Sequence, residues 1–154
     1  MGACAGKGIT SGTVNVAIGK SAMSGDGVTA VTGVYSVAIG GNAGRGVTNG
    51  EANVFVGQSA GRTTCSGDCN VFVGNRAGLV NTSGSCNVAI GMDALLDNTT
   101  ASYNTAVGHC AGASVKTATG NAYFGACAGK CTEGSDNTFI GLNAGKYNHS
   151  SNGN

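Results

Sequence analysis

A glycine recurs about every 17 residues along this chain of 154 residues, and each time it closes a short apolar run. An alanine stands three residues after that glycine in all nine units, and a second glycine follows the alanine in seven of them. A repeat this strict over a whole chain is the signature of a solenoid, in which each unit stacks on the next. The turn-anchor glycines are Gly19, Gly40, Gly57, Gly74, Gly91, Gly108, Gly125 and Gly141, preceded by Gly2 in the first unit.

The composition supports an ordered repeat. Its 29 glycines cost conformational entropy on folding, and a continuous backbone hydrogen-bond ladder between units would offset that cost. A hydrophobic share of 41% with a net charge of +1 argues against disorder, and the absence of proline excludes collagen. The near-neutral charge argues against nucleic acid as a partner, and no apolar run approaches the ~18 residues of a membrane span.

The residues before each anchor glycine predict short β-strands. They read Asn-Val-Ala-Ile or close variants, such as Asn-Val-Phe-Val at 53–56, and are β-branched, aromatic and bounded by glycine. A second, weaker strand is expected in each unit, for example over 9–13 and 47–51. Units of this size bury their apolar faces only by stacking, ~4.8 Å apart. We predict an all-β, single-domain parallel β-solenoid over 1–154, with about nine 17-residue coils and a loop insertion at 25–33, where one interval is 21 residues long.

Alternation along each strand predicts which side chains fill the coil. We assign the columns on either side of the middle strand residue to the interior, so the middle column is expected to point outward. That column is apolar in every unit, and a lone solenoid would expose it as a hydrophobic patch. We therefore predict a homo-oligomer, most simply a trimer. The predicted oligomer interface stripe is Ala17, Ala38, Phe55, Phe72, Ala89, Ala106, Tyr123 and Phe139.

Two polar columns repeat with the same period. An asparagine ladder is expected to hydrogen-bond along the axis, in preference to forming a binding face. A basic column is expected to be solvated, with binding of an anionic glycan as the less favoured alternative. The ladder is Asn15, Asn53, Asn70, Asn87, Asn104, Asn121 and Asn137, and the basic column is Lys7, Arg45, Arg62, Lys130 and Lys146.

The chain has seven cysteines, and two pairs of them occupy equivalent places in successive units. These stacked pairs, Cys69 with Cys86 and Cys110 with Cys127, should lie within the Cα separation that a disulfide accepts. Both a disulfide and a role as small apolar fillers remain open, and the filler interpretation is favoured. The spacing of the cysteines is too loose to predict a zinc site, and the only nearby histidine is His109.

No catalytic constellation recurs in the sequence. The two histidines, His109 and His149, are not accompanied by a repeating nucleophile or base. We therefore expect no enzyme activity, no cofactor and no metal. The carboxylates are scattered over Asp26, Glu51, Asp68, Asp93, Asp97, Glu133 and Asp136, which argues against a calcium-binding β-roll.

The pattern Asn-Val-Ala-Ile-Gly-x-x-Ala at 15–22 and 87–94, with serine in first place at 36–43, resembles the head repeats of trimeric autotransporter adhesins. Residues 137–145, Asn-Thr-Phe-Ile-Gly-x-x-Ala-Gly, are similar to repeats in the shafts of bacteriophage and viral tail fibres. The adhesin unit is shorter, so the comparison with tail fibres is favoured. The resemblance implies a left-handed, trimeric parallel β-roll on a virion or in the extracellular space, working as a stalk or receptor-binding fibre.

The expected function is that of a structural, non-enzymatic fibre or adhesin-type shaft. It would present or space a receptor-binding element, with a cell-surface glycan or protein as the receptor. One alternative is ice binding, because Thr10, Thr48, Thr82, Thr99 and Thr132 are assigned to one column. A second alternative is a self-stacking extracellular filament, because neither end carries an atypical capping unit and the coils would allow end-to-end stacking.

Overall fold

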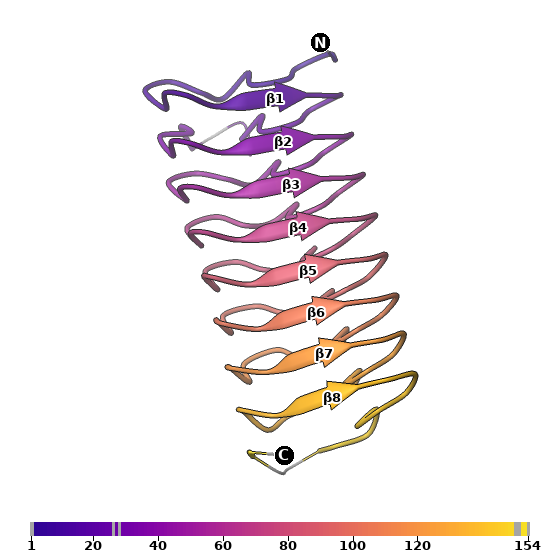
Figure 1. Ribbon diagram of the computed structural model, residues 1–154. Coiled ribbons are helices and arrows are strands. Elements are labelled where there is room, and N and C mark those ends of the chain that lie inside the picture. Colours follow the sequence, from indigo (N-terminus) through magenta and orange to yellow (C-terminus); the bar gives the residue numbers. More distant parts are fainter. Residues whose placement is uncertain (1, 26, 28, 150–151, 154) are drawn as a thin grey trace.

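The computed structural model describes residues 2–25, 27, 29–149 and 152–153. They form a stack of coils, each contributing one short strand to a single parallel sheet (Figure 1). The sheet order is the chain order: β1 (Val16–Ile18), β2 (Val37–Ile39), β3 (Val54–Val56), β4 (Val71–Val73), β5 (Val88–Ile90), β6 (Thr105–Val107), β7 (Ala122–Phe124) and β8 (Thr138–Ile140). The predicted all-β parallel solenoid is confirmed.

The register of the sheet follows the spacing of the repeat. Most neighbouring strands pair residues 17 apart, as in Val54 with Val71. The longer interval shifts the first pair to Val16 with Val37, and the last pair is 16 residues apart. Like residues therefore stack on like residues along the axis, as expected for a repeat whose units form one continuous ladder.

The second half of each coil consists of turns, so the predicted second strand is wrong. In a representative coil, Ser59 and Gly61 have φ of 58° and 55°, and Thr64 N–H donates to Gly61 C=O over 3.1 Å. Left-handed residues at this spacing close tight turns and interrupt the extended backbone that a strand requires. The coils still bond to each other there, since Gly61 N–H donates to Ala77 C=O over 2.9 Å.

The anchor glycines allow the coils to stack closely. All eight in the predicted list have φ between 120° and 137°, outside the range that other residues adopt readily. A Cβ added at Gly74 would lie 2.5 Å from the carbonyl oxygen of Gly91 in the next coil. Glycine is therefore required twice over, by its backbone conformation and by the approach of the neighbouring backbone.

The long interval between β1 and β2 contains a surface loop. Gly27, Thr29 and Ala30 are exposed, whereas Val31 is fully buried and forms a parallel bridge with Ile9. The chain has thus returned to the stack by Val31, earlier than the predicted boundary at 33. Residues 26 and 28 of the predicted insertion lie outside the described residues.

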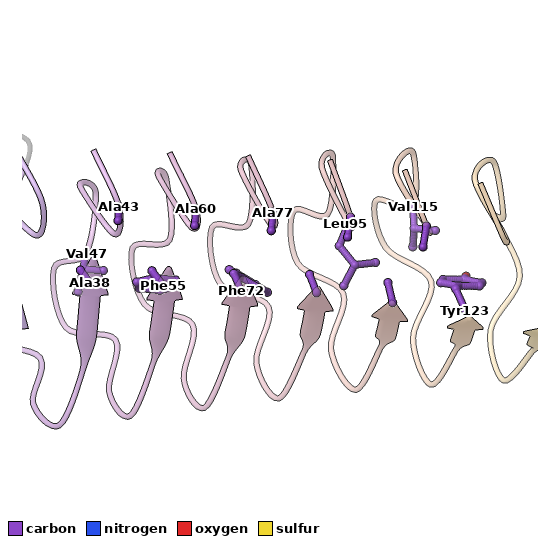
Figure 2. Close-up of a cluster of buried hydrophobic side chains, with 14 of the residues drawn as sticks. Ala38, Ala43, Val47, Phe55, Ala60, Phe72, Ala77, Leu95, Val115 and Tyr123 are labelled. Carbon is purple, nitrogen blue, oxygen red and sulfur yellow. The ribbon is translucent and has the colours of Figure 1, made fainter. Parts of the chain in front are cut away.

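The middle residue of each strand points into the coil, so the predicted direction of the interface stripe is wrong. Ala38, Phe55, Phe72, Ala89, Ala106 and Tyr123 are fully buried within a single chain, and Ala17 and Phe139 pack against the same core (Figure 2). The coil is too narrow for the two flanking columns, because the middle side chains already meet a file of buried alanines from the facing turns, such as Ala43, Ala60 and Ala77.

Large and small residues alternate within this narrow core. A Cβ at Gly61 or Gly78 would lie within 2.5 Å of the ring of Phe55 or Phe72, so an aromatic side chain requires glycine in the facing turn. In the coils of Ala17 and Ala89 the facing residues are Met23 and Leu95, both fully buried. In these two coils the facing residue fills the volume that the strand leaves empty. Beside Ala38 and Ala106 the turn holds glycine, and the ring of Phe55 or Tyr123 in the next coil reaches that space. Both arrangements keep the interior filled, as native packing density requires.

Candidate functional site

The most extensive candidate binding surface is the solvent side of the sheet, which we call the outer face. It consists of the first and third residue of every strand: Val16, Ile18, Val37, Ile39, Val54, Val56, Val71, Val73, Val88, Ile90, Thr105, Val107, Ala122, Phe124, Thr138 and Ile140. None of these is charged, and all are at least partly exposed. These columns, which the sequence analysis placed inside the coil, form the exposed apolar surface of the chain.

The outer face is large for a soluble protomer. Eight strands span ~34 Å, and the two files lie ~7 Å apart, with further residues at both ends of each strand. Exposed apolar side chains continue there, including Tyr35 and Tyr103 before β2 and β6 and Leu142 after β8, each at least 64% exposed. Contiguous apolar patches of several hundred square ångströms mark interaction sites in soluble proteins. This surface is suited to burial against another apolar surface.

The asparagine ladder is confirmed as a structural feature of the interior. Asn87 N–H donates to Asn70 Oδ1 over 3.0 Å, and Asn87 Oδ1 accepts from Asn104 N–H over 3.0 Å. Asn87 Nδ2 donates to Ala101 C=O over 2.8 Å. Each amide thus satisfies backbone groups in neighbouring coils, and in the one unit without asparagine the Ser36 hydroxyl accepts from Asn53 N–H.

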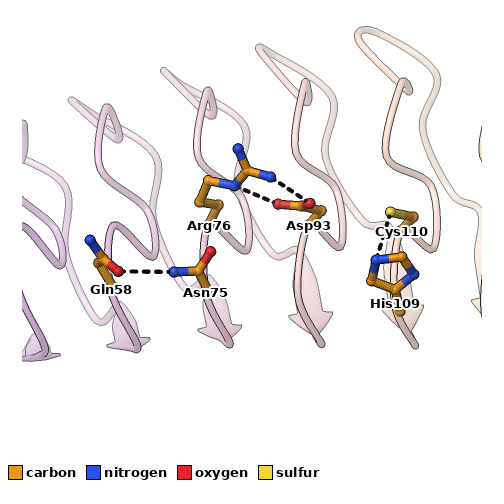
Figure 3. A network of polar contacts seen from close by, with 6 residues as sticks. All are labelled: Gln58, Asn75, Arg76, Asp93, His109 and Cys110. Atoms are coloured by element: carbon orange, nitrogen blue, oxygen red, sulfur yellow. Dashed lines mark hydrogen bonds and ion pairs between the residues drawn. The ribbon is translucent and has the colours of Figure 1, made fainter.

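Asn87→Ala is expected to destabilise the fold by about 2 kcal/mol, because it leaves Asn104 N–H buried without a partner and removes one of the two donors to Ala101 C=O, which keeps its bond from Asn98 Nδ2. Asn87→Ser should cost less, since a serine already serves in the ladder at position 36. The free energy of unfolding in denaturant measures both. Asn75→Ala is the control, because Asn75 bonds to exposed Gln58 outside the ladder (Figure 3). Equal losses in Asn75→Ala and Asn87→Ala would contradict a stabilising role of the ladder.

The basic column lies at the surface, with Arg45 and Arg62 exposed in successive coils. They line a recess of about 330 Å³ together with Thr48 and Thr63. A second recess, of about 510 Å³, is lined by residues that include Lys116, Glu133 and His149. His149 Nδ1 lies 3.9 Å from Glu133 Oε1, but both side chains are mostly exposed, and such a pair contributes little to stability.

The threonine column divides between the surface and the core. The hydroxyls of Thr48, Thr82 and Thr99 donate to the carbonyls of Cys65, Thr99 and Lys116 in the next coil. Thr132, which the sequence analysis placed in the same column, is instead buried and donates to Gly129 C=O. The hydroxyl protons of these four threonines thus form hydrogen bonds within the stack, which disfavours an ice-binding array.

All seven cysteines are free thiols, so neither stacked pair is bridged. Cys69 and Cys86 are exposed, and their left-handed backbones have φ of 56° and 57°. They fill no core space, so the filler interpretation is wrong for this pair. Cys110 and Cys127 are half-buried and follow one another in one file of turn residues.

A polar cluster that the sequence pattern did not predict occupies that file. Arg76 binds Asp93 in the next coil through two hydrogen bonds, Nε to Oδ1 at 2.8 Å and Nη2 to Oδ2 at 2.7 Å (Figure 3). One coil further, Cys110 Sγ lies 3.4 Å from His109 Nε2. The hydrogen bond to Asp93 raises the pKa of Arg76, and burial together with the Asp93 charge raises the pKa of the Cys110 thiol. The signal in the sequence was the 17-residue spacing of positions 76, 93 and 110.

No protein-family model, curated protein or solved structure matches this chain. Over the part of the chain that the structure describes, no helix is long and apolar enough to cross a bilayer. Functional interpretation therefore depends on the geometry of the chain itself, above all on the outer face.

Proposed function

We propose that this chain is a structural, non-enzymatic shaft segment that assembles with copies of itself, in a fibre on a virion or cell surface. The observation that carries the proposal is the outer face, an uncharged strip of mainly Val, Ile and Thr, with Ala122 and Phe124, that runs along the whole sheet. The assembly is a homotrimer, as the resemblance to adhesin heads and tail-fibre shafts implies. The shaft spaces or presents a receptor-binding element that recognises a surface glycan or protein.

Other copies of the same chain are best suited to cover the outer face. The two files of the outer face span ~34 Å by ~7 Å, and exposed apolar side chains such as Tyr35, Tyr103 and Leu142 extend this surface. The face repeats uncharged residues of similar type in every coil, so copies of the chain aligned in parallel around one axis would present apolar side chains to each other along the whole sheet. The unbranched stack of parallel strands is suited to a shaft, since each coil is bonded to the next through the backbone.

The mass in solution tests this proposal. The purified chain should sediment at about three times its 14.8 kDa, and Val73→Asp should release protomers of single mass, because a carboxylate in the centre of the strip opposes burial. Thr63→Asp, an exposed position in a turn away from the sheet, is the matched control and should keep the trimer mass.

A parent chain that sediments as a monomer with the outer face in water would overturn the proposal. Trimer mass retained in Val73→Asp would place the interface elsewhere. Long filaments in electron micrographs would favour the self-stacking alternative. Thermal hysteresis of the purified chain, abolished by charged substitutions on the same strip, would favour ice binding.

A further inference from the structure

Three metal-ligating side chains from two neighbouring coils meet beside the stack. One ligand atom from each of Asp93, His109 and Cys110 lies within 4.8 Å of the other two. Asp93 and Cys110 occupy the same place in successive coils, both with left-handed backbones, at φ of 61° and 55°. His109 directly precedes Cys110, and its Nε2 is 3.4 Å from Cys110 Sγ (Figure 3). The stacking register of the solenoid therefore creates this juxtaposition.

The geometry points to a binding site for a divalent transition-metal ion, with Zn²⁺ as the best fit, held by a carboxylate oxygen of Asp93, Nε2 of His109 and Sγ of Cys110. Mixed S, N and O ligands in a tetrahedral arrangement suit Zn²⁺, and three protein ligands leave a fourth position for water. Separations under 4.8 Å allow one ion at 2.0–2.3 Å from each donor after small side-chain rotations. This site goes beyond the proposed shaft function and does not depend on it.

Arg76 supplies the outer support that such a site requires. Its two hydrogen bonds fix the Asp93 carboxylate in one orientation, and the Asp93 side chain is only 10% exposed. Arg76 donates one hydrogen bond to each carboxylate oxygen, so each oxygen keeps a second lone pair that could bind a metal. Partners that hold a ligand in place typically change metal affinity 10–100-fold when removed. Arg76 is thus a positioning residue, one coil away from Asp93 and two coils away from the thiol.

The surroundings of Cys110 act on its thiol in opposite directions. Burial and the Asp93 charge raise the pKa of the thiol, whereas Lys130 and Arg76 act to lower it. Binding of a divalent ion through Sγ displaces the thiol proton.

Titration of the reduced full chain with Co²⁺ tests the site. We expect a near-ultraviolet thiolate-to-cobalt band and visible ligand-field bands that saturate at one ion per chain and disappear when Zn²⁺ is added. Cys110→Ser should abolish the thiolate band, and His109→Ala, Asp93→Asn and Arg76→Gln should each weaken binding at least about tenfold. Serine is already accommodated at the equivalent left-handed positions 21 and 59, so Cys110→Ser should fold, as circular dichroism will verify.

Cys86→Ser is the matched control, because Cys86 is an exposed turn cysteine outside the cluster, and it should leave the titration unchanged. Absence of a saturable thiolate band in the reduced chain would overturn the proposal. So would a band that persists in folded Cys110→Ser or is lost in Cys86→Ser. Trimer mass is independent of this result, so the failure of one proposal is distinguishable from the failure of the other.

Discussion

Phe72→Asp is expected to unfold the chain, whereas Val73→Asp, one residue further along, should leave the protomer folded. Phe72 is fully buried and its ring lies 5.7 Å from that of Phe55, so its loss removes core packing worth about 3–5 kcal/mol. The new carboxylate would also be desolvated without a partner. Together these costs approach the whole stability of an ordinary domain, about 5–15 kcal/mol.

Val73 lies on the outer face, where a carboxylate of the protomer reaches water, and its substitution should change protomer stability by no more than about 1 kcal/mol. Far-ultraviolet circular dichroism and thermal unfolding compare the two variants. A folded Phe72→Asp protein of reduced mass would restore the original assignment of the middle column to an oligomer interface. Loss of β-structure in Val73→Asp at all concentrations would indicate that the protomer folds only within the assembly.

Features set by the period of the repeat could be predicted from the sequence. The strands, their register and the position of each anchor glycine depend on the spacing between equivalent residues, which the sequence states directly. The asparagine ladder follows from the same register, because residues such as Asn70 and Asn87 must be neighbours once the coils stack.

The direction of the strand side chains could not be read from alternation alone. In β3 all three residues, Val54, Phe55 and Val56, are apolar, so both sides of the strand are candidates for the core. The deciding information lay in the turn, where glycine accompanies every aromatic middle residue and the two large turn residues, Met23 and Leu95, occur only beside alanine. Only residues that share one cavity need such compensation in volume.

The polar cluster required three-dimensional structure for a different reason. The repeat places Asp93 and Cys110 in one file, but left-handed turn residues do not follow the alternation of a strand, so their side-chain directions were not predictable. The second strand was predicted wrongly for a related reason. Threonines and valines after each glycine suggested extended backbone, while the overlapping turns that precede them govern its course.

Ala89→Phe and Leu95→Gly are expected to destabilise the chain separately and to compensate partly when combined. Phenylalanine at 89 would meet Leu95 in the filled interior of the same coil, an overpacking that costs about 1–3 kcal/mol. Leu95→Gly alone would leave a cavity and cost about 2–5 kcal/mol, reduced by relief of the left-handed backbone at φ 48°. The double variant recreates the arrangement of Phe72 with Gly78, in which ring and glycine share one space.

Denaturant unfolding of the four proteins gives the coupling between the two positions. The loss of stability in the double variant should be about 2 kcal/mol smaller than the sum of the losses in the two single variants. Compensation should be incomplete, because Leu95 also packs close to Gly112 in the next coil, beside Ala106, and that space stays empty. Met23→Gly combined with Ala89→Phe is the control, since four coils separate these positions and their effects should add. Additive losses in the Ala89–Leu95 pair would show that the two side chains do not share the interior, and the outer and inner faces of the sheet would have to be reassigned.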